Sequence, residues 1–172
     1  HYPLRRQRQM CIRDSKTDQK EFVDAVEETE KDIENIMSIK GDLVVDEVHR
    51  ELGKVVWDKV GMARDKMGLN HAIDSIPKIK EKFWKNISIP GSDKDMNQEL
   101  EKALRLKDFI ELAELMAHDA LDRNESCGAH FREEYQTSEN EAERNDKDFK
   151  YVASWGYNCL LYTSDAADEE DS

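Results

Sequence analysis

The stretch "MNQELEKALRLKDFIELAELMAHDALDR", residues 96–123, decides the fold because it predicts one long, deeply buried helix. Its first half has a narrow apolar stripe formed by Leu100 and Leu104. A helix that is apolar nearly all round is buried on several sides. In an isolated three-helix bundle, one side of each helix is normally exposed to solvent. We therefore expect polypeptide outside this chain to cover the remaining apolar surface of this helix. Apolar residues occupy most of the surface of the second half: Phe109, Ile110, Leu112, Ala113, Leu115, Met116, Ala117, Ala120 and Leu121.

Three amphipathic helices are expected upstream, over residues 18–39, 45–64 and 69–87, each with apolar residues at a period near 3.6. We expect the first to end at Gly41 in left-handed backbone. Pro77 lies inside the third helix, where its missing amide donor predicts a kink or a broken turn.

The segment "SIPGSDKD", residues 88–95, predicts the turn that precedes the long helix, with Ser92, Asp93 and Asp95 as candidate N-caps. The helical pattern stops after Asn124 and gives way to a charged loop. The apolar and aromatic run "YVASWGY" that follows is a candidate strand.

The two ends of the chain lack the periodicity and capping residues of its interior. Codons can be chosen for residues 159–169 whose reverse complement, in a shifted frame, encodes residues 5–14. One DNA string in two orientations then encodes both ends, as a sequencing adapter read through at each end would. We therefore interpret residues 1–15 and 159–172 as adapter-derived, rather than as a native basic arm and acidic tail, and leave them out of the functional reasoning.

The remaining residues, Lys16–Asn158, number 143, which is enough for one domain with a core. Their net charge is −11, against −13 for the whole chain, and no basic stripe is present, so nucleic-acid binding is disfavoured. No apolar run is long enough to cross a bilayer, so we expect no direct membrane insertion. Cys127 is the one cysteine outside the excluded ends, which fits a reducing compartment.

The segment "RNESCGAHFREEY", residues 123–135, brings a cysteine close to a histidine. Cys127 and His130 have the spacing of half a zinc site, with His118 and Asp119 as conceivable further ligands. A closed zinc site needs four ligands, and the sequence has no second pair of this kind. A cysteine nucleophile needs its base within hydrogen-bond reach and a third orienting group. Neither interpretation is favoured, and we expect no metal.

No other residues form a catalytic set. His49 and His71 lie on charged helices and are expected to face solvent or to cap, while Trp57, Phe83 and Trp84 have the spacing of core or interface residues. No carboxylate stands alone in an apolar setting, and glycine-rich phosphate loops and the nucleophile elbow are absent from the sequence. We expect no catalytic residue and no cofactor-binding residue.

Four blocks of the sequence together resemble a known family. They are "DEVHRELGKVVWDKVGMAR", "IKEKFWKNISIPG", "ALRLKDFIELAELMAHDALDRNESCGAHFREEYQT" and "FKYVASW". They are similar to the C-terminal helical region of the flavoprotein subunit of succinate dehydrogenase and fumarate reductase. The resemblance covers nearly all of residues 20–157. L-aspartate oxidase, which shares this fold, and a free-standing helical interaction module are the alternatives.

The family carries a Glu-Ser-Arg-Gly-Ala-His arm after its last long helix. Cys127 stands where many relatives have arginine, which puts in doubt any salt bridge of that arginine. The resemblance implies a structural role for the arm. The positions that match the arm are Glu125, Ser126, Gly128, Ala129 and His130, followed by Arg132.

The resemblance also implies what the whole protein does. It would interconvert succinate and fumarate by hydride transfer with FAD and pass electrons to an iron–sulfur subunit and a quinone-reactive membrane anchor subunit. Those partners would hold it, from the cytoplasm, on the cytoplasmic face of the inner membrane. The family's flavin-binding and catalytic residues precede Lys16, so this piece is expected to bind no FAD and to be inactive alone.

The expected fold is mainly α: an antiparallel three-helix bundle with an additional N-terminal helix, followed by an irregular C-terminal arm. We place the N-terminal helix in residues 16–41, the bundle in 42–123 and the truncated arm in 124–158. Residues 1–15 and 159–172 complete the division as the adapter-derived ends.

Overall fold

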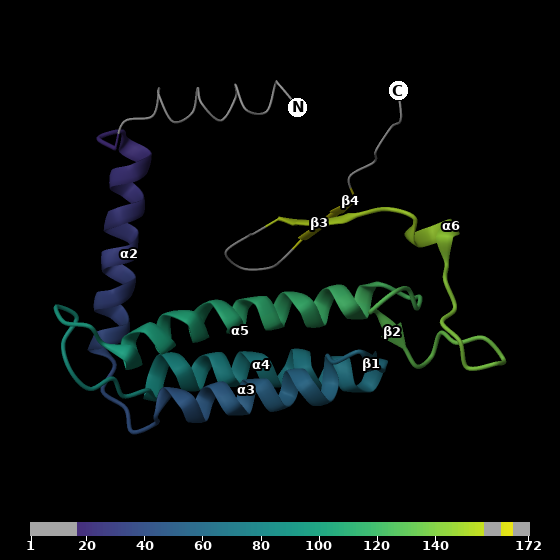
Figure 1. Cartoon of the computed structure of the whole chain (residues 1–172), viewed down its shortest axis with the longest axis horizontal. Coiled ribbons are helices and arrows are strands. Elements are labelled where there is room, and N and C mark those ends of the chain that lie inside the picture. The colour runs from purple at the N-terminus through teal and green to yellow at the C-terminus, as the bar shows by residue number, and fades with distance from the viewer. Residues whose placement is uncertain (1–16, 157–162, 167–172) are drawn as a thin grey trace.

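The computed structural model describes residues 17–156 and 163–166. Three long helices lie side by side, and a fourth projects from one end of them (Figure 1). The helices are α2 (Lys20–Ser38), α3 (Val45–Lys59), α4 (Lys66–Asn86), α5 (Gln98–Asp122) and the short α6 (Asp146–Phe149). The strands are β1 (Ala63–Arg64), β2 (Phe131–Arg132), β3 (Ala153–Gly156) and β4 (Thr163–Ala166).

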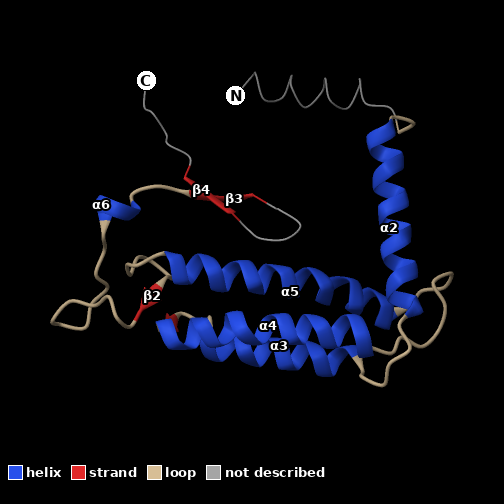
Figure 2. Cartoon of the chain, turned by 180° about the vertical axis from the view of Figure 1, so that it is seen from behind, coloured by secondary structure: helices blue, strands red, loops and turns tan. Residues whose placement is uncertain are grey.

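The core lies between α3, α4 and α5 (Figure 2), of which α4 runs antiparallel to the other two, as the colouring by residue number shows (Figure 1). Small alanines on the buried face of α5 allow its neighbours to approach closely. The mainly α fold, an antiparallel three-helix bundle with an additional N-terminal helix, is therefore confirmed. Its buried residues include Val45, Val48 and Leu52 of α3, Leu69, Ala72, Ile76, Ile79 and Phe83 of α4, and Leu100, Ala103, Leu106, Ile110, Ala113, Ala117 and Ala120 of α5.

The N-cap of α5 is Asn97, so the expectation of Ser92, Asp93 or Asp95 is wrong. The Asn97 side-chain oxygen accepts hydrogen bonds from the backbone amides of the second and third helical residues at 3.1 and 3.2 Å. Its amide nitrogen donates to the Pro90 carbonyl at 2.9 Å. One side chain therefore caps the helix and also closes the preceding turn, which a residue farther upstream could not do.

Gly41 is not a left-handed helix stop, contrary to the sequence-based expectation. Helix α2 already ends at Ser38, and Gly41 is not among the positive-φ glycines. A Cβ atom at Gly41 would lie 2.0 Å from the carbonyl carbon of Asn86. The Gly41 amide donates to the Ile87 carbonyl at 3.1 Å, so glycine is needed for close approach of two backbones rather than for its φ angle.

The boundaries of the middle helices also differ from expectation. Helix α3 ends at Lys59, and Ala63–Arg64 form a strand instead of a last helical turn. Helix α4 passes through Pro77 without a broken turn. Pro77 is exposed, so the carbonyl that loses its amide partner lies on the solvent side of the helix, where water can hydrate it.

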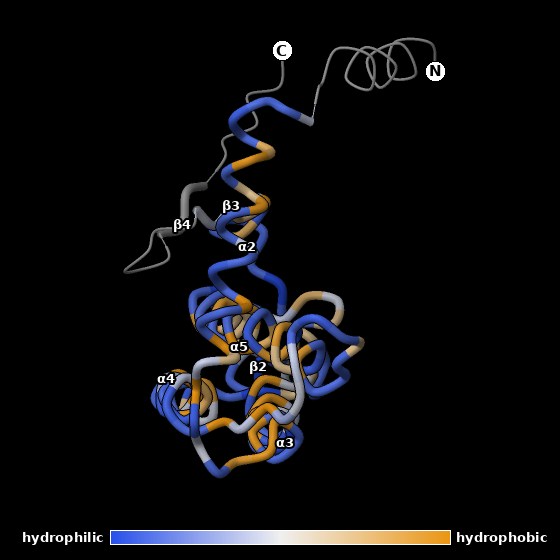
Figure 3. Tube along the Cα trace, turned by 90° about the vertical axis from the view of Figure 1, so that its left-hand side faces the viewer, coloured by the Kyte–Doolittle hydropathy of each residue, from blue (hydrophilic) through white to orange (hydrophobic). Residues whose placement is uncertain are grey.

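Several large apolar side chains remain exposed, as the composition of the long helix predicted. On α5, Phe109, Leu112 and Met116 are 41%, 52% and 42% exposed. Trp57 on α3 is 83% exposed and is therefore not a core residue, whereas Trp84 packs edge to face on buried Phe83 with ring centroids 5.1 Å apart. The hydropathy colouring also shows apolar positions along the projecting helix α2 (Figure 3). No helix in the described part of the chain is long and apolar enough to cross a membrane.

The candidate strand in "YVASWGY" is confirmed as β3. It pairs antiparallel with β4, with Trp155 opposite Ser164. Strand β4 lies within residues 159–172, whose adapter origin stays a prediction.

Candidate functional site at the junction of arm and bundle

The arm returns from the end of α5 to the corner between α3 and α4. Strand β2 pairs in parallel with β1, with Ala63 opposite Phe131. The Phe131 amide donates to the Met62 carbonyl at 3.2 Å, and the Glu133 amide donates to the Arg64 carbonyl at 2.9 Å. Backbone hydrogen bonds therefore fasten the arm to the bundle.

Cys127 and His130 form the two ends of a tight turn. Their backbones exchange two hydrogen bonds, of 2.8 and 3.0 Å, and Gly128 between them has φ 59°. The His130 Nε2 atom donates to the carbonyl oxygen of Arg123 at 3.0 Å. The imidazole is thus used to hold the turn against the end of α5, and the spacing of the cysteine and histidine is that of a hairpin turn.

The geometry of His130 favours its neutral form. Burial lowers the pKa of the imidazole, and the guanidinium groups of Arg64, Arg132 and Arg123 lower this pKa further. The hydrogen bond to the Arg123 carbonyl opposes these effects without reversing them. The folded chain therefore favours the neutral imidazole over the imidazolium more strongly than an exposed histidine would.

The further zinc ligands considered from the sequence are not gathered at this turn. Asp119 accepts a hydrogen bond from the Trp155 indole nitrogen at 2.7 Å. His118, on the last turns of α5, lines a hollow beside the junction rather than the turn itself. Among residues 17–156 and 163–166, no three His, Cys, Asp or Glu side chains are grouped so as to hold a metal ion.

Arg132 is a buried charged residue of the arm, with 1% of its surface exposed. Its Nη1 group donates to the carbonyl oxygens of Ala120 and Leu121 at 2.9 and 3.2 Å. Its Nε group donates to Glu134 at 3.1 Å, and its guanidinium lies 5.4 Å from the ring centroid of Tyr135. A cation placed on the last carbonyls of a helix satisfies unpaired acceptors and complements the helix dipole.

Ser126 and Glu125 complete the buried part of the arm. The Ser126 hydroxyl oxygen accepts from the Arg132 amide at 2.8 Å, and the hydroxyl donates to the Arg132 carbonyl at 3.1 Å. Glu125 accepts from the Arg123 guanidinium at 2.7 Å and from the Asn145 amide at 2.8 Å. Each of these buried polar groups therefore has partners in the arm or at the end of α5, as expected for polar groups with a structural role.

The sequence reasoning missed Arg123 as a member of this network. Besides Glu125, Arg123 contacts the carbonyl oxygen of Tyr151 at 3.1 Å, and its guanidinium lies 5.8 Å from the ring centroids of both Phe149 and Tyr151. These residues are far apart in the sequence, so no local pattern could have indicated the contact.

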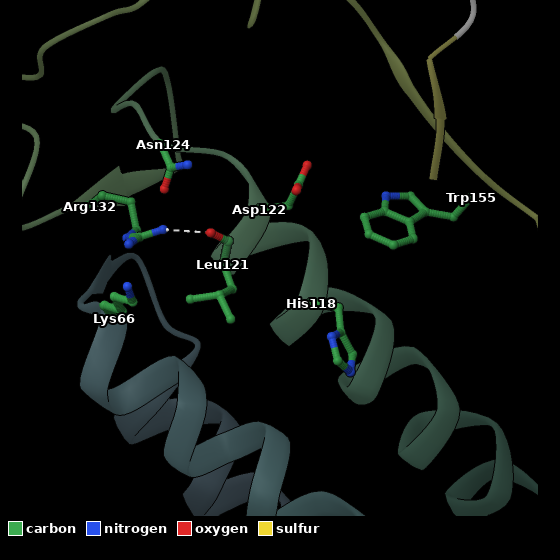
Figure 4. Close-up of a pocket in the computed structure, with 7 residues that line it drawn as sticks. All are labelled: Lys66, His118, Leu121, Asp122, Asn124, Arg132 and Trp155. Atoms are coloured by element: carbon green, nitrogen blue, oxygen red, sulfur yellow. Dashed lines mark hydrogen bonds between the residues drawn. The ribbon is translucent and has the colours of Figure 1, made fainter. Parts of the chain in front are cut away.

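A polar hollow of about 440 Å³ lies beside the junction (Figure 4). The Arg132 guanidinium points to the Leu121 carbonyl at its edge (Figure 4). No nucleophile and base are paired there among the lining residues, so the hollow offers no catalytic arrangement. It is lined by Lys66, His118, Leu121, Asp122, Asn124, Arg132 and Trp155.

A second hollow is apolar and lies between α3 and α5. Its volume is about 200 Å³. We call it the α3–α5 groove. The sequence did not indicate it as a site, although the composition of the long helix predicted that part of its apolar surface would stay uncovered. The groove is lined by His49, Leu52, Gly53, Val56, Phe109, Leu112, Ala113 and Met116.

The described residues do not fit a flavin. Dinucleotide-binding folds hold the pyrophosphate at a glycine-rich turn between a parallel strand and a helix. The parallel pairings within the described ranges are the two-residue pair β1–β2 and an isolated bridge between Leu43 and Ile87, and β1 is followed by Asp65 and Lys66 instead of a glycine-rich turn.

Residues 49–166 match the family model described as the C-terminal region of the fumarate reductase flavoprotein. The chain belongs to this family. The family expected from the resemblance is therefore confirmed.

Relatives of this flavoprotein region occur in bacteria and archaea. An uncharacterized FAD-dependent oxidoreductase of Methanocaldococcus jannaschii is 36% identical over 119 residues, which are 69% of this chain and 21% of that protein. The succinate dehydrogenase flavoprotein subunit of Bacillus subtilis is 31% identical over 124 residues, or 72% and 20% of the two chains. The chain thus spans about a fifth of the length of these relatives.

Solved structures of the family share the fold. A mutant of Escherichia coli quinol fumarate reductase FrdA superimposes with a TM-score of 0.75 at 22% identity, covering 90% of this chain and 26% of that one. The Mycobacterium smegmatis Sdh1 complex in the apo form gives a TM-score of 0.69 at 21% identity, and the match covers 86% of this chain and 24% of that one.

Proposed function

We propose that this chain is the helical support region of a flavoprotein subunit that interconverts succinate and fumarate by hydride transfer with FAD. The observation that carries the proposal is the family match over residues 49–166. Relatives named as succinate dehydrogenase and fumarate reductase flavoprotein subunits support the reaction. The FAD would be held by the part of the subunit that precedes this region.

The contacts within this region support a structural role for it in the subunit. The bundle supplies a rigid body, and Arg132, Glu125 and Ser126 hold the arm against it through buried hydrogen bonds. In the described part of the chain, these groups form hydrogen bonds within the arm and to the end of α5. The region would therefore act by supporting the flavin-binding part and be inactive alone.

The partners and the location extend the same proposal. Electrons would pass to an iron–sulfur subunit and a quinone-reactive membrane anchor subunit, which would hold the protein on the cytoplasmic face of the inner membrane. Structural similarity to a quinol fumarate reductase and to an Sdh1 complex supports an assembly of this kind.

The proposal is tested with a chimera of the Bacillus subtilis succinate dehydrogenase flavoprotein subunit. Residues 17–158 of this chain replace the matching segment of that subunit. We expect the chimera to retain flavin and to oxidise succinate, and we expect a control subunit that lacks the segment to do neither. In parallel, the purified 172-residue chain is expected to show no flavin absorbance and no turnover.

Two outcomes would contradict the proposal. One is a chimera that loses flavin although the parent subunit keeps it. The other is succinate oxidation by the 172-residue chain itself after incubation with FAD.

A further inference from the structure

The α3–α5 groove has a buried apolar floor and exposed apolar walls. Leu52 and Ala113 form the floor, with 3% and 4% of their surfaces exposed. The walls include Leu112 and Met116, both more than two-fifths exposed. Apolar side chains gathered around a hollow in this way mark a site of interaction.

Gly53 lies in this groove, in the middle of α3. Glycine is less favourable than alanine inside a helix because it gives up more backbone freedom. A Cβ atom at Gly53 would meet nothing within 4 Å, unlike one at Gly41, which would overlap Asn86. The described part of the chain therefore gives no steric reason for glycine at this position. The close approach of another backbone would give one.

We infer that the α3–α5 groove seats an apolar helix from the flavin-binding part of the same subunit, packed closely over Gly53. The inference rests on the proposed function, because it assumes that such a part exists. It adds the surface of contact and the kind of segment that fills it. Trp57 lies one turn after Gly53 and is 83% exposed, and the same helix would bury part of its side chain.

The length of the missing polypeptide supports this occupant. The chain matches a C-terminal region and spans about a fifth of its relatives, so most of the subunit lies upstream. That part would enter the bundle through α2. The base of α2 is fixed to α5 by an ion pair between Asp32 and Lys107, two residues before Phe109. The ring of Phe109 packs against His49 at a centroid distance of 5.6 Å and forms one end of the groove.

Charge disfavours a second copy of this chain as the occupant. Each copy carries a net charge of −13, so two copies repel each other. A neutral apolar helix tethered to the same polypeptide meets no such repulsion and is held at high effective concentration.

The test places Gly53→Leu in the chimera described above, with Lys54→Leu as the matched control. Lys54 is the next residue of α3, is exposed and lies outside the groove lining. We expect Gly53→Leu to lower the amount of chimeric subunit that retains flavin by about tenfold. Lys54→Leu is expected to change this amount by less than about twofold. In the isolated 172-residue chain, both variants should keep the helical circular dichroism, and neither should lower the thermal midpoint below that of the parent, because leucine is more favourable than glycine in a helix.

Each outcome decides a separate point. Equal flavin retention by the two chimeric variants would overturn the groove inference and leave the proposed function standing. Failure of the unsubstituted chimera would overturn both. Sedimentation of the isolated chain as a dimer that Gly53→Leu dissociates, with the chimera unaffected, would replace the proposed occupant with a second copy.

Discussion

The Nη1 group of Arg132 lies 2.9 Å from the carbonyl oxygen of Ala120, so a residue of the arm caps the last turn of α5. The helix would otherwise end with unpaired carbonyls in a buried place. The same guanidinium is paired with Glu134, which balances its charge. The arm and the longest helix therefore depend on each other for the satisfaction of their polar groups.

Replacing Arg132 by alanine is expected to lower the free energy of unfolding by about 3 kcal/mol, because it removes a buried cation and leaves its acceptors unpaired. Urea unfolding followed by circular dichroism measures the change. Arg50→Ala, at an exposed position on α3, is the control and should remain within about 0.5 kcal/mol of the parent. Similar losses for both variants would show that Arg132 has no special role.

Two glycine-to-alanine substitutions should act in opposite directions. Gly41→Ala places a methyl group 2.0 Å from the backbone of Asn86 and should destabilise the chain by about 2 kcal/mol. Gly53→Ala meets no neighbour and should stabilise α3 by up to about 1 kcal/mol. Thermal unfolding of the two variants gives the comparison, and a destabilised Gly53→Ala chain would mean that the groove is not open.

Removing the Asn97 cap should cost about 1 kcal/mol, because two amides at the start of α5 lose their acceptor. Asn97→Ala is compared with Asp95→Ala by chemical denaturation. Asp95 is exposed and does not cap the helix, so its variant is expected to stay within about 0.5 kcal/mol of the parent. An equal effect at Asp95 would count against the observed cap.

The stability of the arm should fall on acidification through His130. Its pKa is lowered in the folded chain, so below a pH of about 6.5 the unfolded chain binds more protons than the folded one. The stability that neutral His130 contributes is thus present above that pH and is lost as the pH falls toward the folded pKa. His130→Gln can still donate to the Arg123 carbonyl but does not titrate.

Urea unfolding between about pH 8 and pH 5 measures this dependence. The parent should lose more stability than His130→Gln over the interval. His71→Gln, on the exposed side of α4, serves as the control and should follow the parent. Parallel pH profiles for the parent and His130→Gln would contradict the prediction.

The helices were predictable because their apolar residues recur at the helical period. Residues such as Leu52 and Phe83 occupy the buried positions that the pattern gave them. The helix ends were less predictable. Gly41 and Asn97 owe their roles to residues they meet in space, Asn86 and Pro90, and no local rule contains those partners.

The candidate site was predictable in part. The sequence showed that Cys127 and His130 lacked companions for metal or nucleophile chemistry, and the resemblance located the arm motif. The burial of Arg132 was not foreseeable, because its carbonyl partners belong to another element and arginine is rarely fully buried. Gly53 could not be interpreted from the sequence alone, because a helical pattern does not show whether a neighbour within the chain already requires glycine there.

The parallel pairing of β1 with β2 has a consequence for the order of folding. Ala63 and Phe131 meet only after the chain has closed a loop that contains all of α4 and α5. Closing so long a loop is entropically costly unless those helices have already packed, so we expect the strand pair to form late and to open first. Hydrogen exchange would show this as faster exchange of the Phe131 and Glu133 amides than of amides in the middle of α5. The bundle would then fold first, and the arm would pair with it in a later step.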